Sequence, residues 1–199
     1  MKNLVYFSIL FFFVFWLDGC DQKPVIAPSG KTIKIGIIGP LSGPDDINGK
    51  EGLRGMQFAM RMQPYLQTGD RIELVAEDDR NDPALTVQSL KNLVQKNMIS
   101  AIITFSTSDP VLAMAKVADE NKTPILAVDA DCNANLNEVL GVVLGNTLGN
   151  AREEMKKGDV PSGMTKDIFM EMKLEESLVE AEGFDLVVMG QPEGAGCYC

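Results

Sequence analysis

Short apolar runs alternate with longer amphipathic stretches along the chain after residue 31. The apolar runs predict strands over Thr32 to Gly39, Arg71 to Glu77, Ala101 to Phe105, Ile125 to Val128 and Phe184 to Met189. The stretches between them predict helices over about Gly49 to Gln63, from Asp82, from Asp109, over Asn133 to Leu140 and over Thr165 to Glu182. Such alternation predicts an α/β fold, namely a three-layer, parallel-sheet domain of Rossmann-like type.

Several residues at the ends of these stretches are typical helix signals. The pairs Asp82-Pro83 and Asp109-Pro110 each predict an N-cap aspartate followed by proline at the first helical position. Gly141 is expected to close the helix that begins at Asn133. In the last helix, one side is expected to face the core, and it carries Met164, Ile168, Met172 and Val179.

Loops at the carboxyl ends of parallel strands are where ligands bind in sheets of this kind. Pro40 to Asp46, Asp78 to Asp82 and Ser106 to Asp109 follow the first three predicted strands. The carboxylates of Asp78, Asp79 and Asp82 do not have EF-hand spacing, so a structural turn is expected there rather than a calcium site.

Charge and composition exclude several functions. The chain has 199 residues, a net charge of −10 and no histidine. The negative charge argues against nucleic acid as a partner. The lack of histidine excludes a Ser-His-Asp triad and histidine-ligated zinc.

The first twenty residues have the pattern of a targeting segment. Lys2 precedes an almost wholly apolar run, Leu4 to Leu17, which has the length of a signal-peptide core. Leu17-Asp18-Gly19-Cys20 resembles a bacterial lipobox, in which the signal is cut before a cysteine that is then acylated. Asp18 departs from the small residue usual there, so ordinary cleavage or an uncleaved anchor are the alternatives. Residues 21–31 are expected to be a flexible tether.

The lipobox resemblance implies a location. A lipoprotein anchored at Cys20 is exported and is held on the bacterial cytoplasmic membrane, facing the periplasm or the cell exterior. Asp21, the next residue, resembles an inner-membrane retention signal.

One family resemblance covers about Lys31 to Ala127. IGIIGPLSG, a helix with spaced glycines, EDDRNDP and ITFSTSDPVLAMAKVADENKTPIL occur in the order and spacing of the type I periplasmic binding proteins, the leucine and branched-chain amino-acid receptors of ABC importers. The resemblance implies the first lobe of such a receptor, an amino-acid-like ligand and an ABC permease as partner. It assigns the ligand's carboxylate to Ser106, Thr107 and Ser108, and less directly to Ser42.

Amides at the start of the helix near Asp109 would also favour a carboxylate. The alternative is that Ser106 to Ser108 only caps the start of that helix and binds no ligand.

A second resemblance runs from about Pro124 to Cys199. VDADCNANLNEVLG, REEMKKGDVPSGMTKDIFMEMKLEESLVE and FDLVVMGQPEGAGCYC are similar to the carbon monoxide dehydrogenase accessory ATPase, a nickel-insertion protein of the MinD-like P-loop class. It implies that Asp129 and Asp131 are remnants of a γ-phosphate site and that Asp185 begins a switch strand. Cys197 and Cys199 would supply two thiolates to a zinc or nickel ion shared across a dimer, or would form an unstructured tail.

The nucleotide loop of those ATPases, strand-GKGGxGKT-helix, is absent from the sequence. Phosphates would then lack their amide and lysine cradle, so no ATP, no resident cofactor and no enzymatic activity are expected.

These observations define three hypotheses. The favoured one is a membrane-tethered solute-binding lipoprotein that lacks its second lobe. The others are a fragment of the nickel-insertion ATPase and a chimeric reading frame with no function as a unit. The corresponding division of the chain is a signal peptide (1–20), a tether (21–31), a binding-protein lobe (32–127) and an ATPase-like fragment (128–199).

Overall fold

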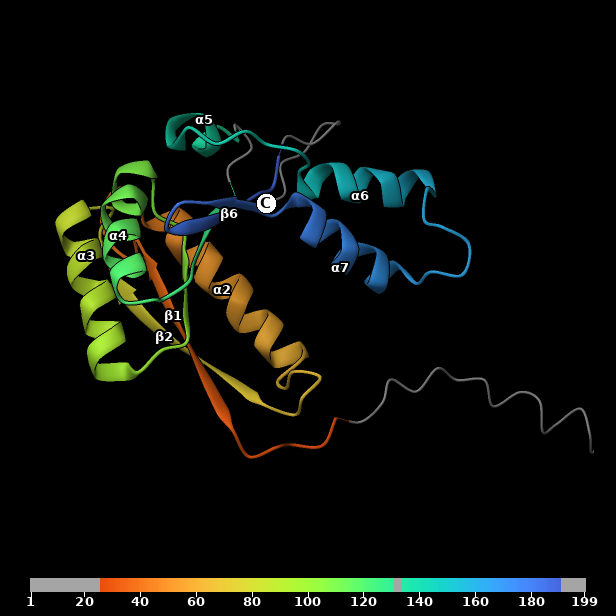
Figure 1. The fold of residues 1–199 in the computed structure, drawn as a ribbon. Helices are drawn as coiled ribbons and strands as arrows, with labels where there is room; N and C mark the ends of the chain where they lie inside the picture. Colours follow the sequence, from red (N-terminus) through yellow and green to blue (C-terminus); the bar gives the residue numbers. More distant parts are fainter. Residues whose placement is uncertain (1–25, 131–133, 191–199) are drawn as a thin grey trace, which may run out of the picture.

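The computed structural model describes residues 26–130 and 134–190, and its strands and helices alternate along most of the chain (Figure 1). The strands are β1 (Thr32–Gly39), β2 (Arg71–Asp78), β3 (Ala101–Thr104), β4 (Ile125–Asp129), β5 (Val179–Ala181) and β6 (Phe184–Val188). The helices are α2 (Asp46–Met62), α3 (Pro83–Asn92), α4 (Ser108–Glu120), α5 (Leu136–Leu140), α6 (Leu148–Lys157) and α7 (Lys166–Ser177), and the π-helical segment η1 (Leu93–Asn97) follows α3.

The strands form one sheet in the order β2-β1-β3-β4-β6-β5. All neighbouring pairs are parallel except β5 and β6, which are antiparallel. Ala127 of β4 lies opposite Thr104 of β3 on one side and opposite Leu186 of β6 on the other. Both halves of the sequence therefore contribute to the same sheet, and the predicted α/β fold is confirmed.

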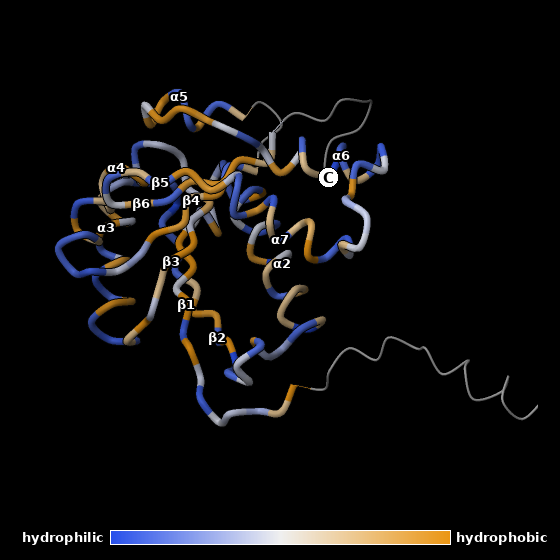
Figure 2. The backbone as a smooth tube through the Cα atoms, turned by 45° about the vertical axis from the view of Figure 1, so that its right-hand side comes forward, coloured by the Kyte–Doolittle hydropathy of each residue, from blue (hydrophilic) through white to orange (hydrophobic). Residues whose placement is uncertain are grey.

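The two faces of the sheet are covered unequally. α3 and α4 lie on one face, where Ile102 of β3 packs in a core with Leu90 and Met114, and all three have no exposed surface. α2 and α7 lie on the other face (Figure 1), where Ile72 and Leu74 of β2 are half buried. The hydropathy of the backbone follows this arrangement, with apolar strands at the centre of the molecule (Figure 2).

α2 and α6 differ from the sequence prediction. α2 begins at Asp46, earlier than predicted. The prediction missed the first turn because that turn carries no apolar stripe, and Ile47 is 70% exposed. α6 was not predicted, since it is largely polar, but it has ordinary end signals: the Thr147 side chain accepts from the Asn150 amide, and Gly158 ends the helix at φ +84°.

The end of α7 also differs. The helix stops at Ser177, and Val179–Ala181 forms β5 instead of continuing the helix to residue 182. Ala181 pairs with Phe184 across a two-residue turn in which Gly183 has φ +83°, a conformation that glycine adopts without strain.

The residues predicted along one side of α7 are covered unequally: Met172 is half buried, whereas Ile168 is 53% exposed. The least exposed apolar side chain of the helix is Phe169, at 2%. By contrast, Leu53, Met56 and Met60 of α2 are half buried, as their predicted shared face requires.

Gly49→Ala should lower the free energy of unfolding by about 1–3 kcal/mol. A Cβ at this position would lie 2.3 Å from the carbonyl oxygen of Pro40, because α2 passes close to the loop after β1. Gly55 on the same helix is the control: a Cβ there meets nothing within 4 Å. Gly55→Ala should therefore raise stability by up to about 1 kcal/mol. Urea unfolding measures both, and equal effects would contradict the close approach at Gly49.

Candidate ligand-binding site

The chain leaves β1 and β3 toward opposite faces of the sheet. β1 leads to α2 on one face, and its neighbour β3 leads to α4 on the other (Figure 1). Where the helices of adjacent strands diverge in this way, a crevice forms between the loops at the carboxyl ends, and ligands of open α/β sheets bind there. Residues 40–45 and 105–107 are the loops that follow these two strands, and residues 79–82 follow β2.

Asp78, at the end of β2, holds the loop after β1. Its carboxylate accepts hydrogen bonds from the Leu41 amide at 2.8 Å, the Ser42 amide at 3.2 Å and the Ser42 hydroxyl at 2.5 Å. Burial acts to raise the pKa of Asp78, but these bonds and one from the Arg80 amide outweigh it, so the pKa lies below its ordinary value. The ionised carboxylate therefore fixes the first loop.

Asp79 holds the loop after β3. It has no exposed surface, and its carboxylate accepts from the Ser106 hydroxyl at 2.5 Å and from the Thr86 hydroxyl at 2.8 Å. Asp79 also accepts from the amide of Asn81 at 2.9 Å. A buried carboxylate is tolerated only with such partners. The aspartates of EDDRNDP thus form a structural turn, as predicted.

Asn81 makes the third link, and sequence reasoning missed it. Its side-chain oxygen accepts from the amide and the hydroxyl of Thr107, at 3.0 and 2.9 Å, and its amide group donates to Asp45 at 2.9 Å. Asn81 has φ +59°, and asparagine is among the residues that tolerate this region. The sequence signal that could have identified Asn81 is its position directly before Asp82, which caps a helix.

These bonds redefine the predicted ligand contacts. The hydroxyl groups of Ser42, Ser106 and Thr107 donate to Asp78 at the end of β2 and to Asp79 and Asn81 in the loop after it, so their protons are used within the protein. Ser108 is half buried and makes no side-chain hydrogen bond within the described ranges. Of the four predicted hydroxyls, Ser108 is the one that retains a proton for a ligand.

The two Asp-Pro pairs do not start their helices in the same way. Asp82 caps α3 as predicted, and its carboxylate accepts from the amides of Ala84 and Leu85, each at 2.9 Å. The prediction that Asp109 caps the next helix is wrong. α4 begins at Ser108, two residues before the predicted first helical residue Pro110, and Asp109 lies inside its first turn.

The start of α4 has no side-chain cap. Thr107 occupies the N-cap position with φ −72° and ψ −179°, but its hydroxyl donates to Asn81. The third helical residue is Pro110, which has no amide hydrogen, and the amides of Ser108 and Asp109 have no hydrogen-bond partner among the residues that the structure describes. α4 has 13 residues, so its amino end carries a partial positive charge. Two unpaired amides there can receive a carboxylate.

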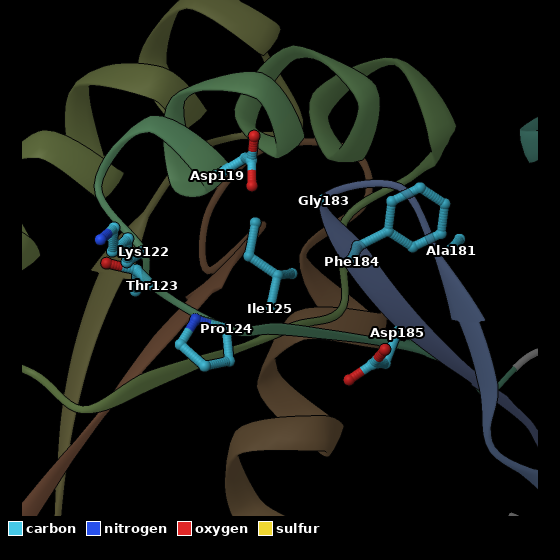
Figure 3. Close-up of a pocket in the computed structure, with 9 residues that line it drawn as sticks. All are labelled: Asp119, Lys122, Thr123, Pro124, Ile125, Ala181, Gly183, Phe184 and Asp185. Atoms are coloured by element: carbon cyan, nitrogen blue, oxygen red, sulfur yellow. The ribbon is translucent and has the colours of Figure 1, made fainter.

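The predicted ATPase-like residues Asp129 and Asp185 lie at opposite ends of the β4–β6 pair, and Asp185 lies at the start of its strand, as predicted. Asp129 ends β4, is 6% exposed and accepts from the Leu136 amide at 3.0 Å. Asp185 lies opposite Leu126, at the other end of the β4–β6 pair, which places it about 10 Å further along the sheet. There it lines a cavity of about 250 Å³ (Figure 3). Burial, and then the charge of Glu180, raise the pKa of Asp185.

The remaining predicted sites fall outside the described residues. These are Cys20 with the leader, residues 21–25 of the tether, Asp131, Cys197 and Cys199. Within residues 26–130 and 134–190, no three or more His, Cys, Asp or Glu side chains are grouped so that they could hold a metal ion. No helix in those ranges has the length and apolar character needed to cross a membrane.

Known proteins match different parts of the chain. A "Leu/Ile/Val-binding protein homolog 6" of Brucella abortus is 26% identical over 99 residues, which cover 49% of this chain and 25% of that protein. An "uncharacterized ATP-binding protein" of Methanocaldococcus jannaschii is 47% identical over 90 residues, covering 43% of this chain and 36% of the other. The chain therefore spans about a third or less of these curated relatives.

Among solved structures, one match is an ABC-transporter solute-binding protein of R. palustris in complex with 4-hydroxybenzoate, with 22% identity, a TM-score of 0.48 and coverage of 81% of this chain and 47% of that one. The family model described as periplasmic binding protein matches residues 32–140, which is past residue 127 where the sequence placed the end of the lobe. The chain belongs to the periplasmic binding protein family.

Ser42→Ala should lower the free energy of unfolding by about 1 kcal/mol at neutral pH, because it removes a hydrogen bond to the ionised Asp78. The folded-state pKa of Asp78 is depressed, so this stabilisation is present above the unfolded pKa of about 3.9 and is lost as the pH falls through the folded pKa. Urea unfolding at neutral pH and below about pH 3 should therefore show a difference that shrinks in acid.

Ser162→Ala is the control, since Ser162 is exposed, and it should change stability by less than about 0.5 kcal/mol. An equal loss of unfolding free energy in Ser42→Ala at both pH values would show that the hydrogen bond does not depend on the charge of Asp78.

Proposed function

We propose that the chain is the first lobe of an exported solute-binding receptor of an ABC importer, and that it takes a small solute with a carboxylate. The family match at residues 32–140 supports the receptor class. The observation that carries the ligand chemistry is the pair of unpaired amides, Ser108 and Asp109, at the crevice between β1 and β3. The Brucella relative named for Leu, Ile and Val supports an amino-acid ligand.

A lobe of this kind is one half of a clamp. Two-lobed receptors enclose a ligand by hinge closure, so one lobe supplies part of the contacts and binds weakly. The leader pattern ending in Cys20 supports a lipid anchor that holds the lobe on the outer side of the cytoplasmic membrane, beside its permease.

The second candidate is a fragment of a nickel-insertion accessory ATPase. The 47% identity to an archaeal ATP-binding protein favours it. Against it stands the missing GKGGxGKT loop. A chimeric reading frame is the third candidate, and sequencing genomic DNA across codons 120–135 separates it from a genuine fusion.

Titration of the full-length chain with L-leucine tests the receptor proposal. Ser108→Pro deletes the amide at the first helical position, where proline is tolerated, and the extended Thr107 can precede a proline. It should weaken leucine binding about tenfold, because a hydrogen bond to a charged group is worth about 1.5–3 kcal/mol. Ser108→Ala removes the hydroxyl alone and should cost less.

Leucinamide, which lacks the carboxylate, is the matched ligand control. It should bind more weakly than leucine and should respond little to Ser108→Pro. Equal binding of leucine to wild type and Ser108→Pro would overturn the placement of the ligand. Binding of Mg-ATP tighter than millimolar, with none of leucine, would favour the ATPase fragment instead.

A further inference from the structure

α2, on the outside of the sheet, is apolar on two opposite sides (Figure 1). One side packs on the sheet through the half-buried residues of its predicted shared face. The other side carries Ile47, Phe58 and Met62, which are 70%, 58% and 72% exposed. At about 100° per residue, these three side chains fall within about 60° of one another around the helix. A surface helix with one packing partner carries one apolar stripe, so the second stripe indicates a second packing partner.

This outer stripe is symmetric along the helix. The midpoint between Ile47 and Met62 is the peptide bond that precedes Gly55, and the midpoint between Glu51 and Phe58 is the same bond. A two-fold axis through that point pairs each residue with its counterpart on a second, antiparallel copy of the helix. Ile47 of one copy then lies opposite Met62 of the other, so the exposed apolar groups at the two ends of the stripe cover each other.

The centre of the stripe is open enough for a second helix. Gly55 is exposed, and a Cβ at this position would meet nothing within 4 Å. The distance between packed helices depends on the side chains at the crossing point, so a glycine there permits a close approach. The larger side chains on either side can then interdigitate with those of the second helix.

The charges on the stripe favour the antiparallel orientation. Glu51 and Arg54 form an ion pair, and their side chains are 61% and 69% exposed. In the antiparallel arrangement, Arg54 of one copy lies about 6 Å along the axis from Glu51 of the other, within reach of these long side chains. A parallel arrangement would instead place like charges opposite each other. Charges beside a helix contact select its orientation in this way.

The charge of α2 also differs from that of the chain. The helix has two acidic and three basic residues, which sum to +1, whereas the whole chain carries −10. Two copies of the chain repel each other through most of their surfaces, but the two α2 helices add nothing to the net negative charge. This face is therefore a favourable place for two copies to meet.

The exposed face of α2 consists of Ile47, Glu51, Arg54, Gly55, Phe58 and Met62. We propose that this face docks a second copy of the chain, with the two α2 helices antiparallel about a two-fold axis beside Gly55. The guanidinium group of Arg54 then stacks on the ring of Phe58 from the other copy. One helix from each copy makes a small interface, so the dimer is weak and depends on concentration. The surface goes beyond the proposed receptor function, because it uses none of the residues that hold the loops of the crevice.

Sedimentation equilibrium of the full-length chain, from about 10 µM to 1 mM, measures the association. Wild type should pass from monomer toward dimer. Phe58→Glu puts a carboxylate opposite Glu51 of the other copy and should weaken the association about tenfold or more. Leu112→Glu is the matched control, since Leu112 is 48% exposed on α4; it should stay within twofold of wild type. Equal association of wild type and Phe58→Glu, or none in wild type, would overturn the proposal.

Charge reversal tests the orientation. Glu51→Arg leaves only positive charges at the centre of the stripe and should weaken the association about fivefold. Adding Arg54→Glu restores opposite charges across the contact and should return the affinity to within twofold of wild type. A double variant that associates no better than Glu51→Arg would overturn the antiparallel arrangement.

Methyl spectra of a mixed sample locate the contact directly. One population is labelled only at isoleucine methyl groups and the other only at methionine methyl groups. Ile47 and Met62 lie about 22 Å apart along one helix, so a nuclear Overhauser effect between them arises only between two copies. This effect should appear as the dimer forms, and its absence from the dimer would overturn the proposal. Binding to anionic lipid vesicles that depends on Phe58, without a dimer in solution, would also overturn it, by assigning the face to a membrane surface.

Discussion

The loops at the carboxyl ends of β1 and β3 are held by two adjacent carboxylates, Asp78 at the end of β2 and Asp79 directly after it. Asp78 holds the loop after β1 through two amides and a hydroxyl, and Asp79 holds the loop after β3 through Ser106. Asp79 is buried, so its charge is tolerated only while its partners are in place. Loss of one of these hydrogen bonds therefore weakens the contacts among all three loops.

The same bonds determine which groups are left for a ligand. Thr107, the N-cap residue of α4, donates its amide and its hydroxyl to Asn81 and makes no capping hydrogen bond to its own helix. In α3, by contrast, Asp82 accepts from the amides of Ala84 and Leu85. This difference between the two helix starts supports the proposed anion-binding position at Ser108.

The strands could be predicted from the sequence because their β-branched runs carry local information, and the cap at Asp82 followed for the same reason. The site itself could be predicted only to the level of loops. Asp109 resembles Asp82 in sequence, because a proline follows each. The N-cap position of α4 is nevertheless occupied by Thr107, whose hydroxyl binds Asn81, 26 residues away in the chain. The β5 hairpin was missed because helix-favouring residues precede Gly183, and pairing with β6 overrides them.

The predicted boundary between residues 127 and 128 is continuous in structure, since β4 pairs with β3 and with β6. The proposed binding groups all precede this boundary, at the loops after β1, β2 and β3. Nitrogen-edited spectra recorded during an L-leucine titration test that assignment most directly. The amide signals of Ser108 and Asp109 should shift, while those of Ala84 and Leu85, which Asp82 already satisfies, should not. Unchanged signals for Ser108 and Asp109 at saturating leucine, or equal shifts at the two helix starts, would contradict it.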